Sequence, residues 1–185
     1  HAVLRHADRR ADLQLKVPGV HNALNAAAAV GAGLASGLTL EQAAAAVAEF
    51  SGSSRRFELR GEVAGIRVYD DYAHHPTEVA AVLAAARAAV AYQPDSSLEP
   101  GQVHAIFQPH LFSRTQSFAA EFGAALEAAD TALVLDIYPA REEPIEGVTA
   151  ELLGHPVHSP DSAVSAVAAV ARPGDIILTI GAGDV

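Results

Sequence analysis

From residue 103 onward, short apolar runs alternate with longer alanine-rich segments, and this alternation constrains the fold more than any other feature of the sequence. Residues 132–135 (ALVL) and 176–180 (IILTI) are apolar at nearly every position. A strand with one solvated face would instead alternate apolar and polar residues. Runs of this kind are typical of a parallel sheet covered by helices on both faces. We therefore predict an α/β fold with a doubly wound, mostly parallel sheet.

The other elements of this region follow from periodicity and turn residues. Alternating residues at 57–60 and 66–69 flank a turn from Gly61 to Gly65 and predict a β-hairpin. The polar, proline-containing segment 92–102 is expected to be a surface loop. The remaining predicted elements are helix 76–92, strand 103–107, helix 113–128, strand 132–137, helix 149–153, a short strand near Val157, helix 161–171 and strand 175–180.

The first 52 residues have a different organisation. We predict a strand at 13–17, a turn at Pro18-Gly19, a helix at 21–35 that Gly37 ends at the C′ position, and a second helix capped by Thr39 that runs to about Phe50. Gln42 completes a capping box with Thr39. Two helices on one strand cannot close a core, so we expect residues 1–52 to end a domain that begins outside this sequence. The small polar residues 51–54 are the expected linker to a second domain, residues 53–185.

Composition excludes several classes of protein. The 185 residues contain no Cys, which excludes disulfides, thiolate zinc sites and a cysteine nucleophile. The 22 acidic and 12 basic residues give a formal net charge of −10, which argues against a nucleic-acid-binding face and favours a soluble, cytoplasmic protein. No apolar run approaches the roughly 20 residues of a membrane span. The chain also lacks Met, so we expect it to be a piece of a longer polypeptide.

Polar and ionisable side chains follow four of the predicted strands. They lie in segments 69–76 (YDDYAHHP), 107–115 (FQPHLFSRT), 136–144 (DIYPAREEP) and 181–184 (GAGD). A doubly wound sheet binds its ligands at the carboxyl ends of its strands. The segments at the opposite edge are instead rich in Gly, Ser and Ala, so we expect a ligand site at the carboxyl edge.

Single residues at this edge leave alternatives open. Arg114 lies just inside a predicted helix start, where the helix macrodipole disfavours a cation, so either an ion pair or an anionic ligand such as a carboxylate would explain it. His74 and His75 could act in acid–base chemistry, cap a loop, or less readily bind a metal. Asp70 and Asp71 could accept hydrogen bonds from ribose hydroxyls or hold a cation. Residues 181–183 (GAG) are half of a phosphate loop, which is a weak signal alone.

Asn22 and Asn25 lie three residues apart at a helix start and hence on one face. A side-chain amide carries a donor and an acceptor that match the N6/N7 edge of adenine. Capping of the helix by Asn22 is the structural alternative.

Taken in order, segments 19–27 (GVHNALNAA), 55–58 (RRFE) and 70–78 (DDYAHHPTE) resemble the Mur ligase family of peptidoglycan synthesis. The resemblance covers nearly the whole chain. Segments 107–115 and 136–144 resemble the members of the family that use L-alanine. The members that recycle murein tripeptide share the motif at 70–76, and they are an alternative interpretation.

The resemblance implies an ATP-dependent amide ligase that joins L-alanine to UDP-N-acetylmuramate through an acyl phosphate. It further implies that residues 1–52 end a central ATP-binding domain and that 53–185 form a Rossmann-like, amino-acid-binding C-terminal domain. The phosphate loop, the UDP site and the main Mg²⁺ ligands would lie in missing parts of the chain, so the fragment itself should be inactive.

The resemblance also implies roles for individual residues. The nucleotide-binding set is Asn22 and Asn25 against adenine with His21 supporting them, Arg56 near the nucleotide, and Asp70 or Asp71 on the ribose. Tyr72, His74, His110 and Arg114 would form the alanine pocket, with Arg114 on the substrate carboxylate and with His74 and Arg114 as the catalytic residues. Leu111 departs from the family, since many relatives have a second Arg there.

Two interpretations from other classes remain. A non-catalytic module that binds adenine nucleotides would keep the fold without ligase activity. A histidine-based metal hydrolase would require a metal ion and no ATP. Neither interpretation requires all four motifs together.

Overall fold

The computed structural model describes residues 2–17, 19–91, 100–183 and 185, which form two compact units, residues 1–54 and residues 55–185. Each unit has its own core and is described by itself. Residues 92–99 lie outside the described residues. They include most of the predicted surface loop at 92–102 and Tyr92, the last residue of the predicted helix 76–92.

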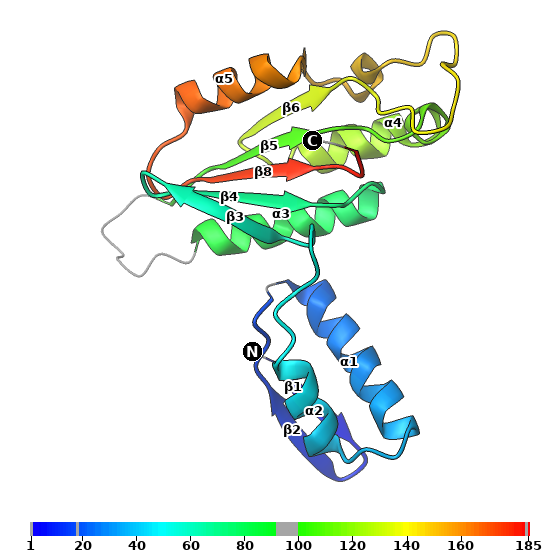
Figure 1. The fold of residues 1–185 in the computed structure, drawn as a ribbon, viewed down its shortest axis with the longest axis vertical. Helices are drawn as coiled ribbons and strands as arrows, with labels where there is room; N and C mark the ends of the chain where they lie inside the picture. Colours follow the sequence, from blue (N-terminus) through cyan, green and yellow to red (C-terminus); the bar gives the residue numbers. More distant parts are fainter. Residues whose placement is uncertain (1, 18, 92–99, 184) are drawn as a thin grey trace. The chain divides into compact units, whose positions relative to one another are not determined.

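The second unit is built on a six-stranded sheet (Figure 1). Its strand order is β3-β4-β8-β5-β6-β7, and every neighbouring pair is parallel except β3 and β4. The prediction of a mostly parallel sheet is therefore confirmed. The strands are β3 (Glu58–Val63), β4 (Ile66–Asp71), β5 (Val103–Phe107), β6 (Thr131–Leu135), β7 (Val157–His158) and β8 (Ile176–Ile180).

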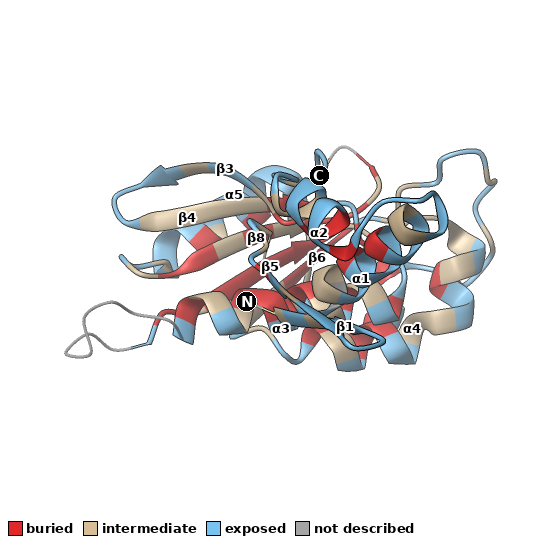
Figure 2. Ribbon diagram, turned by 90° about the horizontal axis from the view of Figure 1, so that it is seen from below, coloured by how far each residue is buried: buried red, intermediate tan, exposed pale blue. Residues whose placement is uncertain are grey.

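Helices cover both faces of this sheet, as predicted (Figure 2). Helices α3 (Pro76–Ala91) and α4 (Phe112–Leu126) pack on one face through a core that contains Leu83, Phe107 and Phe122. Helix α5 (Pro160–Val170) packs on the other face through Ala163 and Val167 against strands β5 and β6. Each fully buried Val, Leu, Ile or Phe side chain contributes roughly 1.5–3 kcal/mol, so the strands and the helices that cover them stabilise the unit together.

The β3–β4 hairpin differs from the prediction in its turn. Only Ala64 and Gly65 connect the strands, with φ angles of 52° and 76°. Two consecutive residues with positive φ form the type I′ turn, whose twist matches that of the strands it joins. Gly61 therefore lies within β3, beside a shift in strand register between Leu59 and Gly61. The predicted helix 149–153 is a single 3₁₀ turn, η1 (Ala150–Leu153).

The first unit corrects one predicted element. The predicted strand at 13–17 is wrong, because β2 (Arg9–Leu13) ends at Leu13 and pairs antiparallel with β1 (Ala2–His6). Most residues of this hairpin are exposed, and no apolar run longer than Ala2–Leu4 marks its strands in the sequence. Leu13, whose side chain is buried, ends the second strand rather than beginning it.

The two helices of the first unit agree with the sequence. Helix α1 (Val20–Ala35) is followed by Gly37 at the C′ position, with a φ angle of 93°. The Gly37 amide donates to the Leu34 carbonyl, and the Leu38 amide donates to the Gly33 carbonyl. These are the two bonds of a Schellman motif. Helix α2 (Leu40–Ala48) begins with the predicted capping box of Thr39 and Gln42. No helix in the described part of the chain is long and apolar enough to cross a membrane.

Candidate functional site

The loops that follow β5 and β6 meet at the carboxyl edge of the sheet and are held together by their backbones. The Tyr138 amide donates to the Pro109 carbonyl at 2.8 Å, and the Leu111 amide donates to the Tyr138 carbonyl at 2.9 Å. His110 and Tyr138 form an isolated parallel bridge, and their rings stack with centroids 5.7 Å apart. Parallel hydrogen bonding therefore continues beyond the strand ends, and it fixes His110 relative to Tyr138.

Four residues predicted for the alanine pocket lie together at this edge. The ring centroids of Tyr72 and His74 are 5.4 Å apart, and those of His74 and His110 are 6.1 Å apart. The Nη1 of Arg114 lies 3.2 Å from the Nδ1 of His110. The residues come from the loop after β4 and from the loop and first helical turn after β5, so they are distant in sequence and adjacent in the fold.

The hydrogen-bond partners assign the protons on both histidines. A guanidinium can only donate, so Nδ1 of His110 accepts and its proton lies on Nε2. The Tyr72 carbonyl can only accept, so Nδ1 of His74, 2.9 Å away, donates. Neutral His74 therefore has its lone pair on Nε2. Burial, Arg114 and His74 lower the pKa of His110 and outweigh the opposing effect of Glu142, so His110 is neutral near pH 7.

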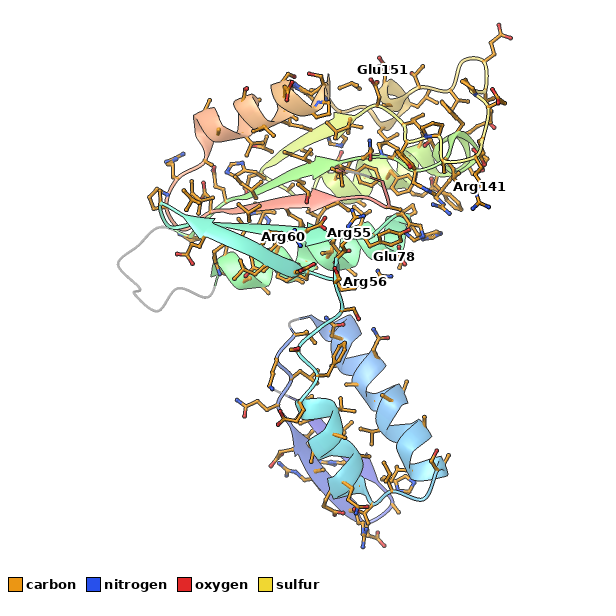
Figure 3. All side chains as sticks on the ribbon, viewed as in Figure 1. Arg55, Arg56, Arg60, Glu78, Arg141 and Glu151 are labelled. Atoms are coloured by element: carbon orange, nitrogen blue, oxygen red, sulfur yellow. The ribbon has the colours of Figure 1, made fainter. Side chains whose placement is uncertain are left out.

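Glu78 organises the loop that carries His74. Its Oε2 accepts hydrogen bonds from the amides of His74 and His75 at 3.0 and 3.2 Å. Burial raises the pKa of Glu78, but these amides and the charges of His74 and Arg56 together lower it below its ordinary value. Figure 3 shows Glu78 and Arg56 on the same side of this edge.

His75 has different surroundings from His74, because its ring packs at 5.0 Å against Phe118 of α4. No cluster of three or more metal-ligating side chains occurs among the residues that the structure describes. The geometry therefore gives no support to the metal-pair interpretation of the two histidines.

Asp70 and Asp71 are both almost fully buried, and each has its own partners. Asp70 accepts from Nε of Arg55 at 2.9 Å and from the Thr179 hydroxyl at 3.1 Å. Asp71 accepts from the amides of Phe57 and Ala73 at 2.7 and 2.8 Å. The two adjacent carboxylates thus bind different parts of the chain at the end of one strand.

Arg55 is a residue of this site that the sequence did not single out. Its guanidinium binds Asp70 and also donates to the Gly181 carbonyl at 2.8 Å, so it joins the ends of β4 and β8. Arg56, which the sequence singled out, is exposed, and its guanidinium carbon lies 5.8 Å from the Tyr72 ring centroid. Both arginines lie within cation–π distance of Tyr72.

The loop after β8 has a steric reason for its glycines. A Cβ on Gly183 would overlap Oε1 of Gln108 and lie 2.8 Å from the Tyr138 ring. The backbone of the loop after β8 therefore packs directly on the loops that follow β5 and β6. Asp184 lies outside the described residues.

The predicted adenine-binding residues belong to the first unit. Asn22 is half-buried and Asn25 is exposed on α1. Capping by Asn22 is wrong, because Gly19 is the N-cap and Asn22 lies within the helix, with its amide donating to the Gly19 carbonyl. His21 lies in the same helix, but its side chain is outside the described part of the structure.

Comparison with known proteins decides the family. The family described as "Mur ligase, glutamate ligase domain" matches residues 55–183, which is more than half of the chain. The chain belongs to the Mur ligase family.

Individual Mur ligases are similar over nearly all of this chain. The UDP-N-acetylmuramate–L-alanine ligase of Paenarthrobacter aurescens (strain TC1) is 60% identical over 178 residues, which cover 94% of this chain and 37% of that protein. The chain thus spans about 37% of the length of this curated relative.

Two solved structures are similar across both units. The UDP-N-acetylmuramate-alanine ligase of Thermotoga maritima gives a TM-score of 0.70 at 28% identity, covering 96% of this chain and 38% of that one. A murein peptide ligase of Psychrobacter arcticus 273-4 gives a TM-score of 0.63 at 26% identity, covering 96% of this chain and 37% of that one.

Proposed function

We propose that this Mur ligase chain is part of an ATP-dependent ligase that joins L-alanine to UDP-N-acetylmuramate in peptidoglycan synthesis. The observation that carries the proposal is the cluster of Arg114, His110 and His74 at the carboxyl edge. A cation beside two differently protonated imidazoles suits a ligand with a carboxylate and an adjacent amine. The names of the most similar relatives support L-alanine rather than a murein peptide as that ligand.

Arg114 is the proposed contact for the carboxylate of alanine. Its bond to neutral His110 holds the guanidinium without neutralising its charge. The remaining N–H groups can therefore form charge-assisted hydrogen bonds with a substrate carboxylate. Because Leu111 replaces the second arginine of many relatives, a single guanidinium would serve this carboxylate.

His74 is the proposed proton acceptor. Alanine enters as an ammonium ion and must lose a proton before its nitrogen can attack. Because Nδ1–H of His74 donates to the backbone carbonyl of Tyr72, the lone pair on Nε2 is available to take that proton. The amine nitrogen then attacks the carbonyl carbon of the muramyl acyl phosphate, the C–N bond forms and the C–O bond to phosphate breaks. One of the two protons still on the nitrogen passes to the departing phosphate, which leaves as hydrogen phosphate. Tyr72 would form a wall of the pocket.

Each unit contains residues that are proposed to bind the nucleotide. In the first unit, exposed Asn25 and half-buried Asn22 would contact adenine, with His21 supporting them. In the second unit, exposed Arg56 would contact the nucleotide. Asp70 or Asp71 would bind the ribose, since a carboxylate can accept hydrogen bonds from ribose hydroxyls. The Mg²⁺ that accompanies ATP would be held mainly by residues outside this sequence, as the resemblance implies.

This assignment also proposes a role for each part of the chain. Residues 1–52 would end the central ATP-binding domain, and residues 53–185 would form the C-terminal domain that brings the amino acid. The same function would place the enzyme in the cytoplasm, where ATP and nucleotide sugars are available.

The proposal is tested by measuring phosphate release from the full-length protein, given ATP, Mg²⁺, UDP-N-acetylmuramate and L-alanine, with each component omitted in turn. The 185-residue chain is assayed alongside. Release that requires every component and is absent from the fragment is the expected result. Release that is indifferent to alanine, or that requires murein tripeptide instead, would refute it.

Arg114→Ala should raise the KM for alanine by about 10²-fold, since it removes a charge-assisted contact worth about 1.5–3 kcal/mol. The KM for ATP should change less than about twofold. Arg141→Ala is the matched control, because this exposed arginine lies on the loop after β6 (Figure 3). An equal rise in both KM values for Arg114→Ala would remove Arg114 from the alanine pocket.

A further inference from the structure

We propose that Glu142 is a positioning residue that holds Arg114, and through it the carboxylate of the incoming amino acid, in the candidate pocket. This inference rests on the proposed function. Glu142 comes from the loop after β6, and it contacts the helix that carries Arg114.

Helix α4 begins without a cap from its own sequence. Its N-cap is Leu111, which has φ 74° and ψ 133° and has no side chain that can accept a hydrogen bond. The first amides of a helix require an acceptor, and a missing cap costs about 0.5–2 kcal/mol. Leu111 is also in a backbone conformation that L-residues rarely adopt. The turn that carries Arg114 therefore requires support from elsewhere.

Glu142 supplies this cap from a distant segment. Its Oε2 accepts from the Ser113 amide at 2.9 Å, and its Oε1 accepts from the Ser113 hydroxyl at 2.5 Å. The hydroxyl and amide of Ser113, with Arg114, lower the pKa of Glu142, so it is a carboxylate at neutral pH. Two bonds to the residue before Arg114 fix the backbone on which the guanidinium is mounted.

The same carboxylate balances the charge at this helix end. A cation in the first turn is opposed by the helix dipole, and an anion there is favoured. Yet no acidic side chain of the described residues forms an ion pair with Arg114 within 4.0 Å. Glu142 thus stabilises the turn through Ser113 while leaving the guanidinium available to a substrate carboxylate.

The first test measures the titration of His110 by NMR in the 185-residue chain. Glu142 raises the pKa of His110, so Glu142→Gln should lower that pKa further, whereas Glu143→Gln should leave it unchanged. Glu143 is the matched control because it is an exposed glutamate in the same loop. No change in the His110 titration for Glu142→Gln would overturn the placement of Glu142.

The second test uses the full-length ligase. Glu142→Gln should raise the KM for alanine about tenfold and leave the KM for ATP within about twofold. Ser113→Ala should have a similar effect, and the double variant should be no worse than the more affected single variant, because both act through one contact. If the wild-type enzyme uses alanine and Glu142→Gln leaves the KM for alanine unchanged, the inference about Glu142 is overturned and the proposed function stands. A wild-type enzyme that does not use alanine would overturn the proposed function, and the inference with it.

Discussion

Arg55, Asp70 and Asp71 show how the residues of two short polar motifs, 55–58 and 70–78, are divided between scaffold and surface. Asp71 is bound to two backbone amides, and Asp70 is bound to Arg55 and Thr179, so both acids hold the start of the unit against the end of β4. Arg56, one residue further on, is exposed. The adjacent residues Arg55 and Arg56 thus have different surroundings. Substitution of Arg55 should lower stability, whereas substitution of Arg56 should affect ligand binding.

At the same scale, we predict that Gly183→Ala destabilises the second unit by about 1–3 kcal/mol. The added Cβ would overlap Gln108 and press on the Tyr138 ring, which stacks on His110. The measurement is the free energy of unfolding in urea, with Gly61→Ala as control, because a Cβ there meets no atom within 4 Å. Equal effects of the two substitutions would show that the loop after β8 tolerates a side chain.

The sequence could predict which residue types gather at this edge but not how each is used. The order of the motifs placed Tyr72, His74, His110 and Arg114 after two strands, β4 and β5, which β8 separates in the sheet. It singled out Arg56 and missed Arg55, because the contacts of Arg55 with Asp70 and Gly181 join residues that are distant in sequence. It also missed the role of Glu142, because the contact with Ser113 joins residues that are 29 positions apart.

At the scale of elements, Asp175 holds the amino ends of β5 and β8 together. Its carboxylate accepts from the amides of Gln102 and Arg172, both at 2.7 Å, and contacts Nε2 of His104 at 3.1 Å. Burial raises the pKa of Asp175, but these donors together lower it below its ordinary value of 3.8.

A lowered pKa in the folded state means that Asp175 contributes stability above pH 3.8 and that this contribution is lost as the pH falls through the folded-state pKa. Asp175→Asn should therefore cost about 1–3 kcal/mol at pH 7 and reduce the loss of stability in acid. Urea unfolding at pH 7 and below pH 3.8 measures both effects, and Glu146→Gln, on an exposed loop, is the control. An unchanged pH dependence in Asp175→Asn would contradict this role.

The elements that the sequence predicted best are those with a local physical signal. The apolar runs of β5 and β8 and the capping box of α2 fall within a residue of their predicted positions. The β1–β2 hairpin was missed, because its strands have no apolar run longer than Ala2–Leu4 and no glycine lies in the turn between them. Pairing between such strands depends on backbone hydrogen bonds and on packing against the helices of the same unit. Neither can be predicted from a local sequence pattern.

At the scale of the whole molecule, the two units differ greatly in the size of their cores. The first unit buries a small cluster around Val30, Leu40 and Ala43. The second unit buries two larger clusters on both faces of its sheet. Because stability follows buried apolar area, the second unit should be the more stable of the two.

We therefore predict that the chain unfolds in two steps, with the first unit opening first. Amide hydrogen exchange in increasing urea measures this, because the Val30 amide in α1 should lose protection at lower urea than the Leu178 amide in β8. Loss of protection at one common urea concentration would show that the chain unfolds as a single cooperative unit.

The bonds that link Tyr138 with Pro109 and Leu111 have a consequence for how this chain can vary through evolution. Because the two loops share a hydrogen-bond register beyond the strand ends, an insertion or deletion between Phe107 and Leu111 would move His110 out of step with Tyr138. Natural sequences should therefore change residue types in this stretch while keeping its length. Length variation should instead collect in stretches such as 144–147, where the chain is exposed or half-exposed.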